Sequence, residues 1–145
     1  IEDAMESVRW IGRLEILQRE PLVVIDGAHN IDGIRLLKES IYTYFKFEKL
    51  ILIIGILKDK QVEDMVSIIA PLAHRVIAVT PNSIRAEDSK ELNEIIEKYN
   101  NKTEACSDYS EAYKKALDYS EKQDMILVCG SLYMIGDMRK IIRKP

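Results

Sequence analysis

Short apolar runs alternate along the chain with segments in which apolar residues recur at helical spacing. The runs have the length of buried strands and occupy residues 22–25, 50–54, 76–79, 103–106 and 125–128. Strands that alternate with helices are typical of a layered α/β domain, because each helix carries the chain back to the start of the next parallel strand. The pattern therefore predicts parallel strands with helices on the faces of their sheet.

The segments between and after these runs place apolar side chains three or four positions apart, on one face of a helix. Asp88 and Asp108 are each followed three residues later by a glutamate, which is the spacing of a helix start. We expect the apolar positions to be core and not a cofactor site. They are Ile34, Leu37, Ile41 and Tyr44 or Phe45; Val62, Met65, Val66 and Ile69; Leu92, Ile95, Ile96 and Tyr99; Ala112, Tyr113, Ala116 and Leu117; and Leu132, Ile135, Met138 and Ile142.

A weaker alternation over residues 13–18 precedes the first run. Residues 19–21 between them are too few for a parallel crossover, so this segment should pair antiparallel at an edge. The chain thus predicts a Rossmann-like, three-layer α/β domain over residues 11–145, with a mostly parallel six-stranded sheet and one antiparallel edge strand. We interpret residues 1–10 as the remnant of an interdomain linker, although the frayed arm of a complete small protein fits their composition equally well.

Composition narrows the classes of partner. The chain has 145 residues, is 47% hydrophobic and carries a net charge of −3 with both signs interspersed, so we expect neither nucleic acid nor a membrane surface as a partner. Cys106 and Cys129 are too few for a zinc site and are predicted to be buried and reduced. No apolar run approaches the roughly 20 residues that span a bilayer, and we expect a cytoplasmic protein.

Candidate chemistry gathers where the predicted strands end, at residues 26–30, 55–60, 80–85 and 130–131. Ligands of open parallel sheets bind beyond the carboxyl ends of the strands. The first segment is Asp26-Gly27-Ala28-His29-Asn30. Its carboxylate can accept bonds from ribose hydroxyls, its helix start attracts phosphate or carboxylate, and its imidazole can donate to an oxyanion or move a proton. The alternative is an Asp-Gly turn with Asn30 as a helix cap.

Two further segments offer groups for anions. Ser131 and Tyr133 open the last helix and make a plausible seat for a carboxylate, although a plain serine cap explains Ser131 as well. Lys60 could neutralise an anion or merely solvate a loop. The sequence has no Walker P-loop, no Gly-x-Gly-x-x-Gly and no Gly-x-Ser-x-Gly, which argues against a dehydrogenase or a serine hydrolase.

Four motifs in order resemble the C-terminal domain of folylpolyglutamate synthases and bifunctional dihydrofolate synthases, within the Mur ligase superfamily. They are Trp10-Ile11-Gly12-Arg13-Leu14-Glu15, Asp26-Gly27-Ala28-His29-Asn30, Gly55-Ile56-Leu57-Lys58-Asp59-Lys60 and Gly130-Ser131-Leu132-Tyr133. The resemblance implies an amide ligase that activates a folate carboxylate with ATP as an acyl phosphate and joins it to L-glutamate. It also implies a monomer whose N-terminal ATPase domain holds the Mg²⁺ ligands, with none on this domain, so that this fragment alone would be inactive.

The resemblance further implies roles for single residues. Arg13, Asp26 and Asn30 would bind the nucleotide, with Arg13 at the phosphates and Asp26 at the ribose. His29 would be the catalytic residue between phosphate and glutamate, while the substrate-binding residues would be Lys60, Ser131 and Tyr133. Two alternatives stay open: a free-standing nucleotide- or anion-binding module, and the same domain from a cell-wall Mur-type amino-acid ligase.

Overall fold

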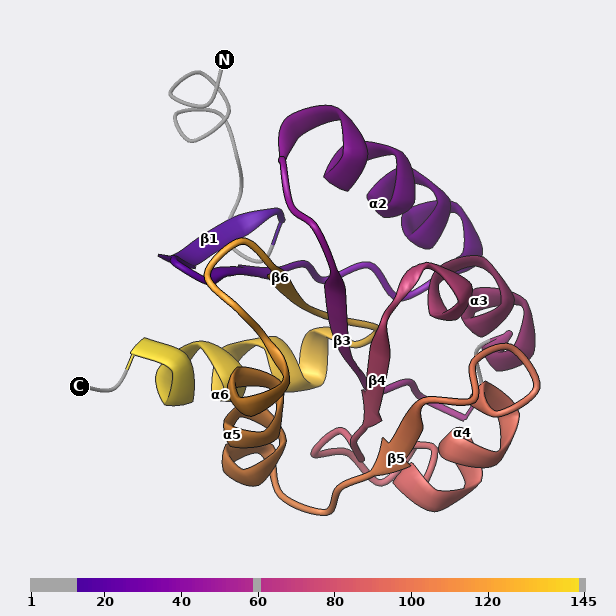
Figure 1. Cartoon of the computed structure of the whole chain (residues 1–145). Coiled ribbons are helices and arrows are strands. Elements are labelled where there is room, and N and C mark those ends of the chain that lie inside the picture. The colour runs from indigo at the N-terminus through magenta and orange to yellow at the C-terminus, as the bar shows by residue number, and fades with distance from the viewer. Residues whose placement is uncertain (1–12, 59–60, 144–145) are drawn as a thin grey trace.

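A computed structural model describes residues 13–58 and 61–143 (Figure 1). Strands and helices alternate along the chain, as the apolar pattern predicts. In order they are β1 (Glu15–Arg19), β2 (Leu22–Ile25), α2 (Ile31–Tyr44), β3 (Leu50–Ile54), α3 (Val62–Ile69), the 3₁₀ helix η1 (Ala70–Leu72), β4 (Arg75–Ala78), α4 (Ser89–Ile96), β5 (Thr103–Ala105), α5 (Tyr109–Tyr119), β6 (Met125–Cys129) and α6 (Leu132–Arg143).

The strands form one six-stranded sheet in the order β1-β2-β6-β3-β4-β5. Only the β1–β2 pair is antiparallel, and β1 lies at an edge. This confirms the predicted sheet with its reversed edge strand. Strand β6 comes last in the chain yet lies between β2 and β3, so that Leu127 pairs with both Val24 and Leu52.

Helices cover both faces of the sheet, with α2, α3 and α4 on one face and α5 and α6 on the other (Figure 1). Successive strand residues point to opposite faces, so Leu52 and Ile54 join the core under α2 to α4, whereas Ile51 and Ile53 join the core under α5 and α6. All residues of β3 and β6 are buried. Their unbroken apolar runs therefore reflect strands covered on both sides.

One predicted core position, Leu132, is wrong, and of the two residues considered at the end of α2 only Phe45 packs against the core. Leu132 is 60% exposed and Tyr44 is 42% exposed. Each lies at the end of its helix, Leu132 first in α6 and Tyr44 last in α2, and a terminal turn can extend beyond the sheet that the rest of the helix covers. Phe45, the other residue considered at this position, packs against the core instead.

The predictions for two helix starts and for the two cysteines are confirmed. Asp88 accepts a bond from Lys90 N at 3.1 Å and Asp108 one from Ser110 N at 3.3 Å, which confirms the two predicted helix starts. Cys106 and Cys129 are both buried free thiols. Within the described ranges, no helix has the length and apolar character that crossing a bilayer requires.

Candidate functional site

The segments that follow the strands meet at the carboxyl edge of the sheet. Gly130 N donates to Ala28 O at 3.0 Å, and Gly55 N donates to Cys129 O at 3.3 Å. The backbone thus joins the loop after β2, the start of the loop after β3 and the start of α6. This confirms the prediction that the chemistry-bearing segments share one edge, as far as the described residues reach.

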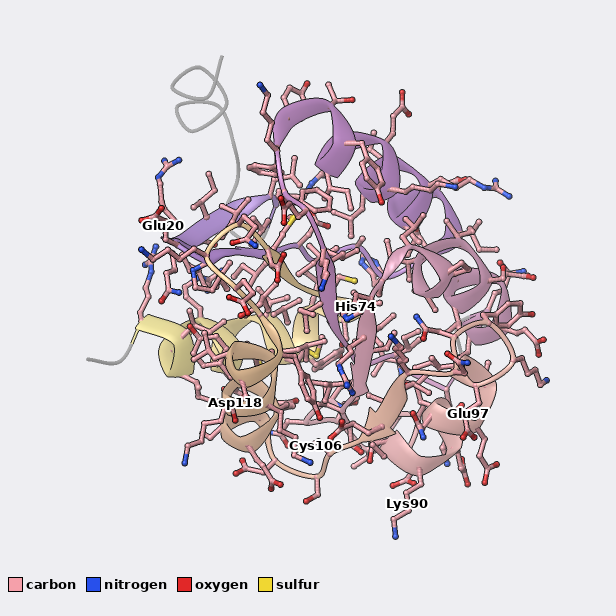
Figure 2. The ribbon with its side chains drawn as sticks, viewed as in Figure 1. Glu20, His74, Lys90, Glu97, Cys106 and Asp118 are labelled. Carbon is pink, nitrogen blue, oxygen red and sulfur yellow. The ribbon has the colours of Figure 1, made fainter. Side chains whose placement is uncertain are left out.

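His74 and Cys106, both labelled in Figure 2, lie at opposite edges of the sheet. His74 directly precedes β4 and marks the amino edge of the sheet, whereas Cys106 directly follows β5 and marks the carboxyl edge. His74 therefore lies at the opposite end of the sheet from the candidate site, as a half-buried residue. This separation makes it a useful reference histidine.

Asp26 is a buried carboxylate that ties two segments together. It is 5% exposed, its Oδ2 accepts from Leu14 N at 3.0 Å, and its Oδ1 accepts from Ala28 N at 2.8 Å. Each carboxylate oxygen keeps a second lone pair, which is free to accept a bond from a ribose hydroxyl. That contact with a nucleotide stays a prediction. The structure adds an internal function that the sequence did not indicate, since Asp26 holds the segment before β1 against the end of β2.

Burial raises the pKa of Asp26, and the backbone bonds from Ala28 and Leu14 together with the Arg13 charge oppose that rise without cancelling it. A raised pKa means that the folded state binds more protons than the unfolded state once the pH passes the ordinary value of about 3.9. The stability that Asp26 contributes is then complete below that value and is lost as the pH rises through the raised pKa.

We expect Asp26→Asn to remove this pH dependence, because an amide does not titrate. The difference in free energy of unfolding, parent minus Asp26→Asn, should fall as the pH rises from about 4. Urea unfolding across pH 3–7 would measure it, with Asp118→Asn on the exposed face of α5 as the control. A difference that stays constant, or that grows with pH, contradicts the expectation.

His29 follows Asp26 in the same loop and is half-buried. Its Nδ1 lies 2.9 Å from Gly27 O. A carbonyl oxygen only accepts, so Nδ1 must carry the hydrogen and Nε2 is the acceptor nitrogen of the neutral ring. A ring held in this tautomer can take a proton from an amine through Nε2.

Asn30 caps the helix that His29 approaches. Its Oδ1 accepts from Gly33 N at 2.7 Å, in the N-cap position of α2. The capping interpretation of Asn30 is therefore confirmed. Contact with a nucleotide stays a prediction, which the exposed residue could make through its amide nitrogen.

Ser131 and Tyr133 differ in their access to solvent. Ser131 is 1% exposed and its Oγ accepts from Tyr133 N at 3.1 Å, so the hydroxyl serves as a cap of α6. Tyr133 is 54% exposed at the same edge. Arg13 is exposed and acts on Asp26 through its charge, whereas Lys60 lies outside the described residues. Binding of glutamate by Ser131, Tyr133 and Lys60 stays a prediction.

Two open cavities lie apart from Asp26, His29 and Ser131, and residues 80–82 of one predicted segment line the first of them. One, of about 670 Å³, opens beyond β4 and β5, where Asn82 N donates to Tyr109 Oη at 2.8 Å. The other, of about 520 Å³, lies at the amino edge beside His74 and Lys102. Residues 13–58 and 61–143 contain no group of three or more His, Cys, Asp or Glu side chains that could hold a metal ion.

A doubly covered, mostly parallel sheet with polar loops gathered at its carboxyl edge defines an α/β domain of the kind that binds its ligands at that edge. The sequence model described as "Mur ligase, glutamate ligase domain" matches residues 12–132. The chain therefore belongs to the family of Mur ligase glutamate ligase domains.

Individual relatives agree with this assignment. The dihydrofolate synthase/folylpolyglutamate synthase of Bacillus subtilis is 29% identical over 143 residues, which are 99% of this chain and 33% of the relative. The UDP-N-acetylmuramoyl-L-alanyl-D-glutamate--2,6-diaminopimelate ligase of Wolinella succinogenes is 30% identical over 124 residues, 82% of this chain and 28% of the relative. The chain thus spans about a third of the length of such relatives.

A solved structure shows the same fold. The folylpolyglutamate synthase of Mycobacterium tuberculosis, described as complexed with ADP, superposes with a TM-score of 0.87 at 23% sequence identity. The match covers 96% of this chain and 34% of that chain. At this sequence identity the likeness establishes the fold alone, and the chemistry must be argued from the residues of this chain.

One feature of the site was missed at the sequence level. Glu15 is buried at the start of β1 and bonds to Arg139 of α6, 124 positions away. The only signal was its place at the end of the Trp10–Glu15 motif. Its partner could not be read from any local pattern.

Proposed function

We propose that this domain is the glutamate-handling part of an ATP-dependent amide ligase that joins L-glutamate to a folate carboxylate. The observation that carries the proposal is the 3.0 Å bond from Gly130 N to Ala28 O. It unites the His29 loop with the start of α6 in a domain of the Mur ligase family. The names of the Bacillus subtilis and Mycobacterium tuberculosis relatives support the folate branch.

In the proposed reaction the folate carboxylate attacks the terminal phosphoryl group of ATP, which forms an acyl phosphate and releases ADP. The glutamate amine loses a proton and attacks the acyl carbon, the carbon–oxygen bond to phosphate breaks, and inorganic phosphate leaves. Acyl phosphates hydrolyse, so water must be excluded while the amine is positioned. Closure of this domain over a separate ATPase domain of the same polypeptide, which would act as a monomer, supplies both conditions.

The nucleotide would be held here by three groups. The Arg13 guanidinium suits phosphate oxygens, because it presents several donors and a fixed charge. Asp26 suits ribose hydroxyls through the lone pairs that its backbone bonds leave, and Asn30 adds a donor at the helix start. Mg²⁺ would neutralise the phosphates from the ATPase domain.

The glutamate would be held on the other side of His29. Lys60, Ser131 and Tyr133 supply an ammonium and two hydroxyl groups, which suit carboxylates. His29, with its proton on Nδ1, would accept the amine proton at Nε2. Its place between the two binding groups is what the resemblance to the folate ligases implies.

The direct test joins this domain to its ATPase domain and measures ADP release. We expect release that requires both glutamate and a folate substrate, and no turnover by the 145-residue chain alone. Omission of each substrate in turn is the control. ADP release at the same rate with and without glutamate would refute the proposal.

Two alternatives make different predictions in the same assay. The match to the Wolinella succinogenes ligase favours a cell-wall acceptor as the second candidate, and that enzyme would turn over with a UDP-muramoyl peptide and not with folate. A free-standing nucleotide module would bind ATP by itself. Calorimetry on the isolated chain separates this case, since the proposed ligase domain holds only part of the nucleotide site.

A further inference from the structure

The short segment that carries Arg13 into β1 is held by two buried carboxylates. Asp26 Oδ2 accepts from Leu14 N at 3.0 Å. The next residue, Glu15, is 6% exposed and accepts from Arg139 Nη2 at 2.8 Å and from Arg139 Nε at 3.0 and 3.1 Å. Arg143 Nη2 adds a further contact to Glu15 at 3.2 Å. Leu14 is thus fixed to the end of β2, and the next residue, Glu15, is fixed to α6.

Leu14, between these anchors, has a left-handed backbone conformation with φ of +49°. A side chain with a Cβ seldom adopts this conformation, which persists only where the surroundings determine it. Leu14 is also buried in the core. Its conformation sets the direction in which the chain leaves Arg13, so whatever fixes Leu14 also fixes the backbone of Arg13.

The Glu15–Arg139 pair suits the fixing of geometry better than the supply of stability. A buried ion pair gains little over an apolar pair of similar size, because both charges lose their hydration. A two-pronged guanidinium–carboxylate contact instead restricts orientation. Arg139 lies on α6, the helix that begins at the candidate glutamate site, so the pair ties the Arg13 segment to that helix.

We propose that Glu15 is a positioning residue that, through its bonds to Arg139 and the conformation of Leu14, places Arg13 for contact with the nucleotide phosphates. Glu15 itself touches no substrate. The inference rests on the proposed function in one respect, namely that Arg13 faces those phosphates. Asp26 shares the task, because its bond to Leu14 N holds the same segment from the other side.

A double-mutant cycle in the full-length ligase tests the proposal. We expect Glu15→Gln to raise KM for ATP by about tenfold with a smaller change in kcat, and Arg13→Ala to raise it at least as much. Glu15→Gln keeps the size of the side chain and should leave the fold intact. In the Arg13→Ala background it should change KM by less than about twofold, because its effect passes through Arg13.

Glu104→Gln is the matched control. Glu104 lies on β5 at the other edge of the sheet and pairs with Lys115 at 2.8 Å and with Tyr119. Its loss should reduce stability in urea without a change in KM for ATP. Arg139→Lys, which keeps the charge but not the two-pronged contact, should raise KM by an intermediate factor.

The outcomes distinguish the positioning function of Glu15 from the placement of Arg13 at the phosphates. If Arg13→Ala raises KM and Glu15→Gln raises it equally in both backgrounds, the positioning function is overturned while the nucleotide site stands. If Arg13→Ala leaves KM unchanged, the placement of Arg13 at the phosphates fails, and the positioning proposal fails with it. If Glu104→Gln raises KM for ATP as much as Glu15→Gln does, the rise caused by Glu15→Gln reflects lost stability and not positioning.

Discussion

Gly130→Ala should destabilise the domain by about 3 kcal/mol, a large part of the 5–15 kcal/mol that folded domains typically have. Gly130 has φ of +112°, and a Cβ built there would lie 2.3 Å from Gly55 O and 3.1 Å from Ile54 Cγ1. The first contact is with the backbone directly after the central strand β3, which cannot move aside cheaply. The variant should also weaken the bond from Gly130 N to Ala28 O that joins the two loops of the site.

The same substitution six positions later is the control. Gly136 lies within α6, and a Cβ there meets no heavy atom within 4 Å. Gly136→Ala should therefore stabilise the domain by about 0.5–1 kcal/mol, since alanine favours helix over glycine. Urea unfolding followed by circular dichroism measures both. Variants that lie within about 0.5 kcal/mol of each other would contradict the argument from backbone geometry.

His29→Ala in the full-length ligase should lower kcat by about 100-fold, which is typical for the loss of a general base. The bond from Nδ1 to Gly27 O presents Nε2 as the acceptor for the amine proton. Alanine removes both the loop contact and the base. Single-turnover formation of the amide, started by mixing enzyme, ATP and folate with glutamate, isolates the step.

His29→Asn separates the two functions of the ring, because an asparagine amide can replace Nδ1 as the donor to Gly27 O but offers nothing in place of Nε2. We expect it to fold like the parent and to be as slow as His29→Ala. His74→Ala, at the amino edge of the sheet, should leave kcat unchanged. A fast His29→Asn enzyme would show that the histidine is only a loop support.

The strands and helices of the fold were predictable because burial on two faces leaves a strong mark on the sequence. The run of five apolar residues in β3 and that in β6 could each be recognised as a covered strand. Their order in the sheet could not be predicted, since either run would fit any interior position. The apolar pattern also could not predict the exposure of Leu132, because helical spacing does not show where a helix extends past the edge of its sheet.

The candidate site divides in the same way. The location of Asp26 and His29 at the carboxyl edge was predictable because residues after parallel strands meet at one edge. The sequence could not show that both Asp26 oxygens already accept backbone bonds, and it left the serine cap at Ser131 undecided against a carboxylate seat. The Glu15–Arg139 pair spans 124 positions. Such contacts depend on tertiary packing, which no local pattern encodes.

The position of β6 has a consequence for how the domain comes into being. Strands β2 and β3 are not neighbours, and β6 fills the place between them, with residues 125–128 paired to both. During synthesis, the β1–β2 part and the β3–β5 part of the sheet must wait until β6 has left the ribosome before they can join. Until then the facing edges of β2 and β3 are open to other chains, so a nascent chain truncated before residue 125 should be prone to aggregation.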